Sequence, residues 1–263
     1  MSIWAGRVKL TSTLLFAFGI VVSIIWQPSS ASADQKYTDE ELRKFFEVVA
    51  VGKRPRSKIV KWIKAPTIRL ETMTVGPRDP ETGNAIPIPT QSDVSFYNFL
   101  IGFIAELNEL TGLKMRLMPR DIGSGGDIVI TVAPRVVMRS IPFKGVSRAL
   151  LRDLLGPGRC FFVAWPDQEW RLTRAHIVIN SLLNKNHIKH CFIEELTQSM
   201  GLPHDSDKLR PSIFNESSKE PKLTPLDHIM IRTLYDPGLP TGSGLGTVRE
   251  ITPKIIQRYS SAK

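Results

Sequence analysis

Two adjacent carboxyl side chains, Glu194 and Glu195, precede the amide Gln198 and the imidazole His204 in the segment 191–205. Residues three and four apart share one face of a helix, so Glu194 and Gln198 are expected on one face with Glu195 beside them. Carboxylate, amide and imidazole groups so placed can ligate a cation, and a carboxylate can take a proton from water. The alternative is a partly exposed helix with a polar face, ended by Gly201.

The chain has two cysteines, Cys160 and Cys191. In an oxidising compartment we expect them to form one disulfide, which closes a loop of about 30 residues and stabilises the fold by about 3–4 kcal/mol. The alternative is a metal site in which a cysteine is paired with His187 or His190. No CxxC-type spacing supports that alternative.

The elements that must position these side chains are expected to form a mixed α+β fold. The helix that carries Glu194 is predicted over residues 185–200, directly after a strand. A final helix is predicted from the N-cap Thr224, with Pro225 at its first position and Asp227 three residues after the cap. Other helices are expected at 38–51, 95–110 and 147–155, strands at 62–75, 114–118, 127–132, 161–165, 170–173 and 176–180, and a loop at 76–91.

The segment 175–235 resembles the metzincin and matrixin branch of the zincins, a group of zinc peptidases. That branch has a strand, a helix His-Glu-x-x-His-x-x-Gly-Leu-x-His, a Ser-Ile-Met turn and a final helix. Here the matching stretches begin at Glu194, at Ser212 (Ser-Ile-Phe) and at Leu223, and the last one ends at Tyr235. The chain is also similar to the bacterial domain-of-unknown-function family numbered 2927, with its Glu-Glu-x-x-Gln helix. The resemblance implies a zincin-like fold, with a small twisted mixed sheet, an active-site helix and a C-terminal helix.

The departures from the zincin pattern concern the metal ligands. The resemblance places Glu195 at the catalytic base and Glu194, Gln198 and His204 at the metal positions, with Asp205 as a further ligand. Carboxylate and amide oxygens are harder ligands than imidazole, so zinc is disfavoured and either no metal or another divalent cation is expected. Two interpretations stay open: a metal-free cluster that binds substrate, or a variant site that still activates water.

The first 33 residues are typical of a secretory signal peptide. Arg7 and Lys9 precede an apolar run at 14–26, and Ala31-Ser32-Ala33 is a small-residue cleavage site. A retained membrane anchor is the alternative, but the run is shorter than the roughly 20 residues of a stable span. We therefore expect a periplasmic or secreted protein with no transmembrane span after cleavage.

The net charge is +10, or +8 without Arg7 and Lys9, since no acidic residue precedes Asp34. A basic surface suits nucleic acid, anionic membranes or cell-wall polymers, and export disfavours nucleic acid. The expected organisation is a signal peptide at 1–33, an N-terminal helix and basic connector at 34–60, a zincin-like domain at 61–245 and a C-terminal tail at 246–263. The oligomeric state is left open.

Three functions fit these observations. The first is a non-catalytic or weakly catalytic protein that binds an extracytoplasmic polypeptide or cell-envelope component by strand addition. Its edge strand is predicted to contain Ile177, Val178, Ile179 and Asn180. The second is a metal-dependent peptidase with the variant Glu-Glu-x-x-Gln site. The third is an envelope structural protein that contacts anionic polymer or lipid through the basic segment 53–64.

Overall fold

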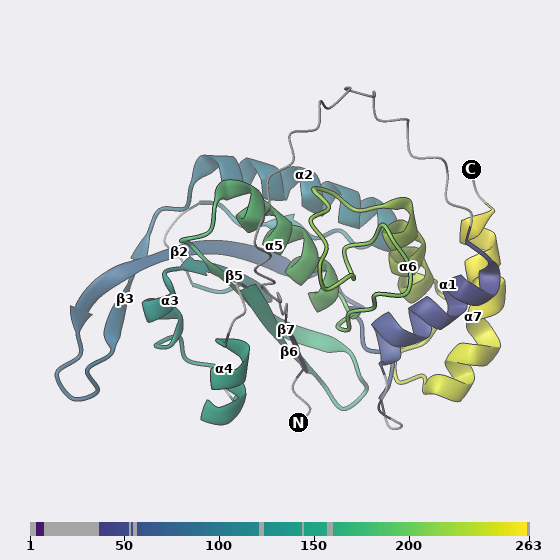
Figure 1. Cartoon of the computed structure of the whole chain (residues 1–263), viewed down its shortest axis with the longest axis horizontal. Helices are drawn as coiled ribbons and strands as arrows, with labels where there is room; N and C mark the ends of the chain where they lie inside the picture. Colours follow the sequence, from purple (N-terminus) through teal and green to yellow (C-terminus); the bar gives the residue numbers. More distant parts are fainter. Residues whose placement is uncertain are drawn as a thin grey trace, which may run out of the picture.

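The computed structural model describes residues 4–7, 37–52, 54, 57–120, 124–143, 145–156 and 160–261. Most of the predicted signal peptide, including its cleavage site, lies outside the described residues. The fold is α+β, as predicted (Figure 1). Its helices are α1 (Asp39–Phe46), the π-helical turn η1 (Glu47–Val51), α2 (Val94–Thr111), α3 (Arg135–Met138), α4 (Arg148–Leu154), α5 (Lys185–Ser199), α6 (Pro225–Tyr235) and α7 (Leu245–Ser260). Its strands are β1 (Trp4–Arg7), β2 (Thr67–Arg78), β3 (Ala85–Thr90), β4 (Arg116–Leu117), β5 (Ile128–Ala133), β6 (Cys160–Pro166) and β7 (Leu172–Asn180).

The strands form one mixed sheet in the order β1-β6-β7-β5-β2-β3, with β4 pairing with the start of β2. β5 is parallel to both β2 and β7. β6 is antiparallel to β7, and β1 is antiparallel to β6 with Trp4 opposite Ala164 and Arg7 opposite Phe161. β1 lies inside the predicted signal peptide, where no strand was expected.

β7 lies in the interior of the sheet. Its residues pair with β5 on one side and with β6 on the other, so Ile177 is opposite both Ile130 and Phe162. The prediction that residues 177–180 form an edge strand is therefore wrong. β6 pairs with β1 on its outer side, so without β1 it would be the edge strand at this end of the sheet.

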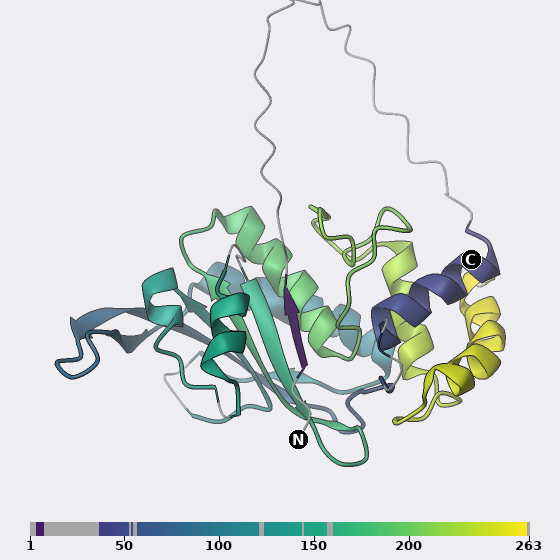
Figure 2. The ribbon, with the colours of Figure 1, turned by 60° about the horizontal axis from the view of Figure 1, so that its bottom comes forward.

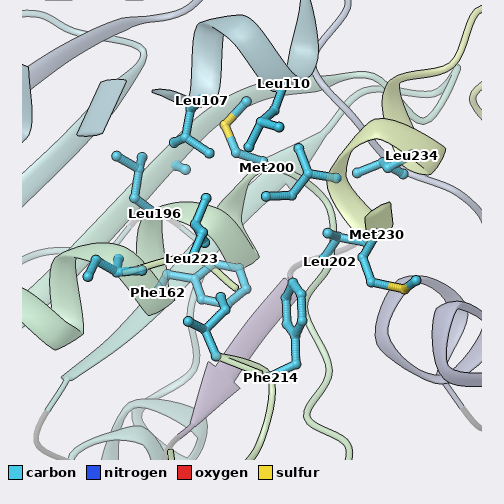
Figure 3. Close-up of a cluster of buried hydrophobic side chains, with 14 of the residues drawn as sticks. Leu107, Leu110, Phe162, Leu196, Met200, Leu202, Phe214, Leu223, Met230 and Leu234 are labelled. Atoms are coloured by element: carbon cyan, nitrogen blue, oxygen red, sulfur yellow. The ribbon is translucent and has the colours of Figure 1, made fainter. Parts of the chain in front are cut away.

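Helices cover both faces of the sheet (Figures 1 and 2). The side chains of β6 alternate between two cores, because successive residues of a strand point to opposite faces. Cys160, Phe162 and Ala164 belong to the larger core, which α2, α5 and α6 complete. Phe161, Val163 and Trp165 belong to the smaller core beneath α3 and α4. Figure 3 shows part of the larger core, which includes Leu196 and Met200 from the end of α5.

The N-terminal and C-terminal helices complete the larger core. α1 packs against α7, and the two lie side by side in Figure 1. Most of the predicted C-terminal tail is this helix α7, whose Val248, Ile255 and Ile256 are buried in the same core as Phe45 of α1. The predicted divisions at residues 60 and 245 therefore do not separate independent cores.

A buried aspartate connects α6 to the turn before it. Asp227 accepts hydrogen bonds from Ser212 Oγ at 2.6 Å, from Ile213 N at 3.2 Å and from Thr224 N at 2.8 Å. Thr224 and Asp227 form the predicted capping box. Burial raises the pKa of Asp227 to about 6, although its hydrogen bonds oppose the shift. These bonds fix the position of Phe214, whose ring meets Phe45 edge-on with centroids 6.4 Å apart.

Within the described ranges, none of the helices combines the length and apolar character that crossing a membrane requires.

Candidate functional site

The predicted site residues lie on α5, which is fixed at both ends. Asn184 caps its first turn by accepting from His187 N at 3.0 Å. At the other end the chain turns at Gly201, where φ is +119° and a Cβ atom would lie 2.0 Å from Val60 O. Only glycine fits there, since other residues would meet both backbone strain and a clash. The helix packs against β6 and β7 on one side and against α2 on another.

Three predicted site residues are almost completely buried in the middle of α5. Glu194, Glu195 and Gln198 have exposed fractions of 1%, 0% and 2%. Both carboxyl oxygens of each glutamate, and Oε1 of Gln198, have no hydrogen-bond partner among the described residues. A buried polar atom without a partner costs free energy, and most such atoms are paired. This group of oxygen atoms therefore has the character of a site that takes a proton or a cation.

The burial changes the acidity of the two glutamates. Loss of solvent raises the pKa of Glu194 and of Glu195 well above the usual carboxyl range. The negative charge of Glu194 raises the pKa of Glu195 further, and the nearby Asp205 acts in the same direction on both. Without a cation, the pair therefore retains protons at pH values where an exposed glutamate is ionised.

Asp205 joins the cluster through Gln198. The Gln198 amide Nε2 donates to Asp205 Oδ1 at 2.7 Å. Burial raises the pKa of Asp205 to about 7, and the hydrogen bond from Gln198 opposes this shift. Because the Gln198 NH₂ group is engaged with Asp205, its carbonyl oxygen is the atom left for a ligand or cation.

His204 is placed by a contact outside α5. Its backbone N–H donates to Val49 O at 3.2 Å, and its ring lies over Gly52, where a Cβ atom would be 2.5 Å from His204 Nε2. Burial and the positive charge of Arg54 lower the pKa of the imidazole, so its neutral form is favoured. Among the described residues, His204 is not in the group of His, Cys, Asp and Glu side chains whose ligand atoms converge.

His190 contacts the cluster instead. His190 Nε2 lies 3.4 Å from Glu194 Oε2, at the i,i+4 spacing, and its Nδ1 lies 3.0 Å from Glu220 O. A carbonyl oxygen only accepts, so in the neutral ring Nδ1 carries the proton and Nε2, the nitrogen nearer to Glu194, does not. Burial lowers the pKa of His190.

A cavity of about 400 Å³ opens beside this histidine. It is lined by Asn184, Lys185, Asn186, His187, His190 and Lys219. His190 thus has one side toward the cavity and the other toward Glu194.

The disulfide between Cys160 and Cys191 is present, as predicted, with its Cα atoms 6.0 Å apart. It attaches the first residue of β6 to α5. It also borders the cluster: Cys160 Sγ and one carboxyl oxygen each of Glu194 and Glu195 all lie within 4.8 Å of one another. In the disulfide, this sulfur is bonded to Cys191 and is not a thiolate ligand.

The cluster suits a hard cation better than zinc. Glu194, Glu195 and Gln198 offer oxygen atoms without partners, and oxygen ligands are preferred by Mg²⁺, Ca²⁺ and Mn²⁺. A hydrolytic metal, however, needs an open position for water and substrate, which requires access from solvent. Exposed fractions of 2% or less leave no such access in this conformation.

The basic segment 53–64 is less basic at the surface than its sequence indicates. Lys61 is buried, and its ammonium group donates to Leu234 O at 2.8 Å and to Leu239 O at 2.6 Å. Burial lowers the pKa of Lys61 to about 8. Lys53, Pro55 and Arg56 lie outside the described residues, so the predicted envelope-binding face is described only in part.

The structure thus brings Glu194, Glu195 and Gln198 together with Asp205, which was expected as a further ligand, and it adds His190. The i,i+4 spacing of His190 and Glu194 was available as a signal in the sequence. The approach of Cys160 to the glutamates also had a signal, because the predicted disulfide attaches Cys160 to Cys191, three residues before Glu194.

Comparisons with known proteins gave one match. No curated protein and no solved structure matches this chain. The model of a family described as a protein of unknown function, DUF2927, matches residues 39–254, which include every helix from α1 to α6 and most of α7. The chain therefore belongs to the DUF2927 family of proteins of unknown function.

Proposed function

We propose that this chain is an exported protein that binds an extended polypeptide by strand addition along β6. The observation that carries the proposal is the antiparallel pairing of residues 4–7 with residues 161–164. An extended segment is accommodated there by main-chain pairing, which is the usual basis of peptide recognition at a sheet edge. If the leader is removed after Ala33, as we expect, this position is free for another polypeptide.

The composition of β6 supports this proposal. The opposite edge strand, β3, contains Pro87 and Pro89, whose missing N–H groups discourage further pairing. Between Cys160 and Trp165, by contrast, β6 has neither a proline nor a charged residue. An apolar edge strand without such protection pairs readily with another chain.

The proposal assigns a binding role rather than catalysis, because the glutamates are closed off from solvent. A peptide bond must reach the metal-bound water and the base Glu195 in order to be hydrolysed. Glu195 has an exposed fraction of 0%. The disulfide between β6 and α5 is consistent with the expected periplasmic or secreted location, since disulfides persist in oxidising compartments.

A metal-dependent peptidase with a zincin-like fold is the second candidate. It is favoured by the partnerless oxygens of Glu194, Glu195 and Gln198, which would hold a divalent cation, and by the order β7, α5, turn and α6. The cation would polarise water or a carbonyl group. This candidate requires stoichiometric metal that is lost in Glu194→Gln, and peptide hydrolysis that is lost in Glu195→Gln.

Peptide binding is tested with a synthetic peptide of residues 1–12 and protein consisting of residues 34–263. We expect binding by isothermal titration, together with slower hydrogen exchange of the amides at 161–164. The matched control peptide has Pro in place of both Ala5 and Gly6. Successive N–H groups of a strand point to opposite edges, so adjacent prolines remove one N–H group from each edge. One of the two prolines therefore interrupts the pairing with β6, whichever edge of the peptide faces that strand.

The proposal is contradicted if the proline peptide binds as tightly as the unmodified one. It is also contradicted if the amides at 161–164 exchange equally slowly with and without peptide. Cleavage of the peptide during the titration, abolished by Glu195→Gln, would favour the peptidase.

A further inference from the structure

A sulfur atom borders the buried carboxyl groups of Glu194 and Glu195. Cys160 Sγ lies within 4.8 Å of a carboxyl oxygen of Glu194 and of one of Glu195, and those two oxygens are equally close to each other. The three residues are buried, with exposed fractions of 2%, 1% and 0%. Among the described residues, this is the one group of three His, Cys, Asp or Glu side chains that converges in this way.

The burial of this group and its missing partners indicate that the two glutamates hold either protons or a cation. The four carboxyl oxygens of Glu194 and Glu195 have no hydrogen-bond partner among the described residues. The only cationic type of side chain with a described contact to either carboxyl is the imidazole of His190, at 3.4 Å from Glu194. Buried carboxylates are ordinarily paired or bound to a metal. While the disulfide is intact, however, the group lacks its third ligand.

We propose that reduction of the Cys160–Cys191 disulfide creates a buried site for a thiophilic divalent cation, with Cys160, Glu194 and Glu195 as ligands. A dithiol reductant supplies two electrons and two protons: the S–S bond breaks, Cys160 and Cys191 become thiols, and the reductant becomes a disulfide. On metal binding the Cys160 thiol and the glutamates release the protons that they carry. This site does not involve the peptide edge. It shares Glu194 and Glu195 with the metal site of the second candidate function, but it requires the Cys160 thiolate, which that site does not use.

The chemistry of the three ligands defines the class of metal. A thiolate selects zinc-type ions over Mg²⁺ and Ca²⁺, which prefer oxygen alone. One thiolate and two carboxylates carry three negative charges, which a divalent ion reduces to one. Zinc ligands lie about 2.0–2.3 Å from the ion, so tetrahedral ligand atoms are about 3.5 Å apart. The ligand atoms lie within 4.8 Å of one another, so they need to approach by no more than about 1.3 Å, and release of Cys160 from Cys191 frees its sulfur to move.

A matched pair of variants in the full chain tests the site. Cys191→Ser and Cys160→Ser both abolish the disulfide and remove the same cross-link. Only Cys191→Ser keeps the sulfur that converges with the glutamates. We expect Cys191→Ser to bind Co²⁺ or Zn²⁺ one to one without reductant, about tenfold or more tightly than Cys160→Ser. The Co²⁺ complex should show a thiolate charge-transfer band in the near ultraviolet.

Changes to the glutamates test the remaining ligands. Glu194→Gln or Glu195→Gln in the Cys191→Ser background should each weaken binding about tenfold, because an amide replaces a carboxylate ligand. Equal affinity of the two serine variants, or binding that is unaffected by both glutamine changes, would overturn the proposal.

Wild-type protein provides the measurement if a serine variant does not fold. After anaerobic reduction and removal of the reductant, Zn²⁺ should protect Cys160 from alkylation by iodoacetamide, and Mg²⁺ should not. The degree of labelling at each cysteine is read by mass spectrometry. Equal alkylation of Cys160 with Zn²⁺ and with Mg²⁺ contradicts the site.

Discussion

Glu194 and Glu195 differ from ordinary helix carboxyl groups because each loses solvent without gaining a hydrogen bond from a described residue. In the absence of a cation, the protonated form of each side chain has the lower free energy. The folded chain therefore binds more protons than the unfolded chain over a range of pH that begins near the ordinary glutamate pKa of about 4.3. At the level of single residues, the cluster makes stability dependent on pH.

Glu195→Gln should reduce this dependence. A group whose folded-state pKa is raised contributes stability that is complete below its unfolded pKa and is lost as the pH rises through the folded value. Glu195 has a raised pKa, so the wild type should lose stability between about pH 5 and pH 8. The glutamine variant should lose less, by about 1–2 kcal/mol. The measurement is urea unfolding at both pH values.

Comparing the two proteins separates the pH dependence caused by Glu195 from that of groups whose contribution to stability has the opposite sign. His190 and His204 have lowered pKa values, so their contribution to stability rises with pH up to about 6.5. They are present in both proteins and largely cancel in the difference. Glu109→Gln, at an exposed position of α2, is the matched control. Parallel pH profiles of wild type and Glu195→Gln would show that the glutamate is not protonated in the folded state.

The limits of sequence reasoning are visible at these same residues. The shared face of Glu194 and Gln198 followed from helical periodicity, because both belong to one helix. The position of His204 did not follow, because its ring rests on Gly52, about 150 residues earlier in the chain. In the expected metal set, Glu194 and Gln198 were placed by a local pattern. The position of the third member, His204, depends on a long-range contact that no short motif in the sequence encodes.

At the scale of elements, α5 ends where two backbones touch. Gly201 has a φ of +119° and leaves no room for a Cβ atom, which would lie 2.0 Å from Val60 O. Gly112, which ends α2, also has a positive φ of +71°, but a Cβ atom there meets nothing within 4 Å. Alanine at Gly112 therefore meets backbone strain alone, whereas alanine at Gly201 meets both backbone strain and a steric clash.

Gly201→Ala should destabilise the fold by about 3 kcal/mol or more, because strain and overpacking add. Gly112→Ala should cost about 1–2 kcal/mol, from strain alone. Chemical unfolding of the two variants beside the wild type measures the difference. If both glycine variants lose the same stability, the close approach of Gly201 to Val60 is not energetically important.

The elements that the sequence predicted well are those with local signals. α2 and α6 show helical periodicity or a capping box, and both occur within one or two residues of their predicted limits. β3 was predicted as loop because of Pro87 and Pro89. Prolines two apart direct their nitrogens to one side, so β3 can pair with β2 on the other side while its prolines face outward. Strand order has no local signal, and for that reason β7 was mistaken for an edge.

At the scale of the whole molecule, the two ends of the described domain stabilise each other. α1 and α7 are far apart in sequence but pack together over the larger core (Figure 2). Polar contacts also attach α7 to the rest of the fold: Ser260 Oγ donates to Asp39 Oδ1 of α1 at 3.2 Å, and Arg249 Nε lies 3.1 Å from a carboxyl oxygen of Glu47 in η1. The family match also extends from α1 into α7, which agrees with one folding unit.

A chain that ends at Gly244 should therefore lose its cooperative fold. Truncation removes Val248, Ile255 and Ile256, all buried, and uncovers the apolar face of α1. Burial of each of these side chains contributes about 1.5–3 kcal/mol, so the loss of about 4.5–9 kcal/mol approaches the whole stability of a typical domain. The measurement is thermal unfolding followed by near-ultraviolet circular dichroism. A chain shortened only after Ser260 is the control and should unfold within about 0.5 kcal/mol of the full chain. An unchanged midpoint on truncation at Gly244 would instead mean that α7 does not contribute to the cooperative fold.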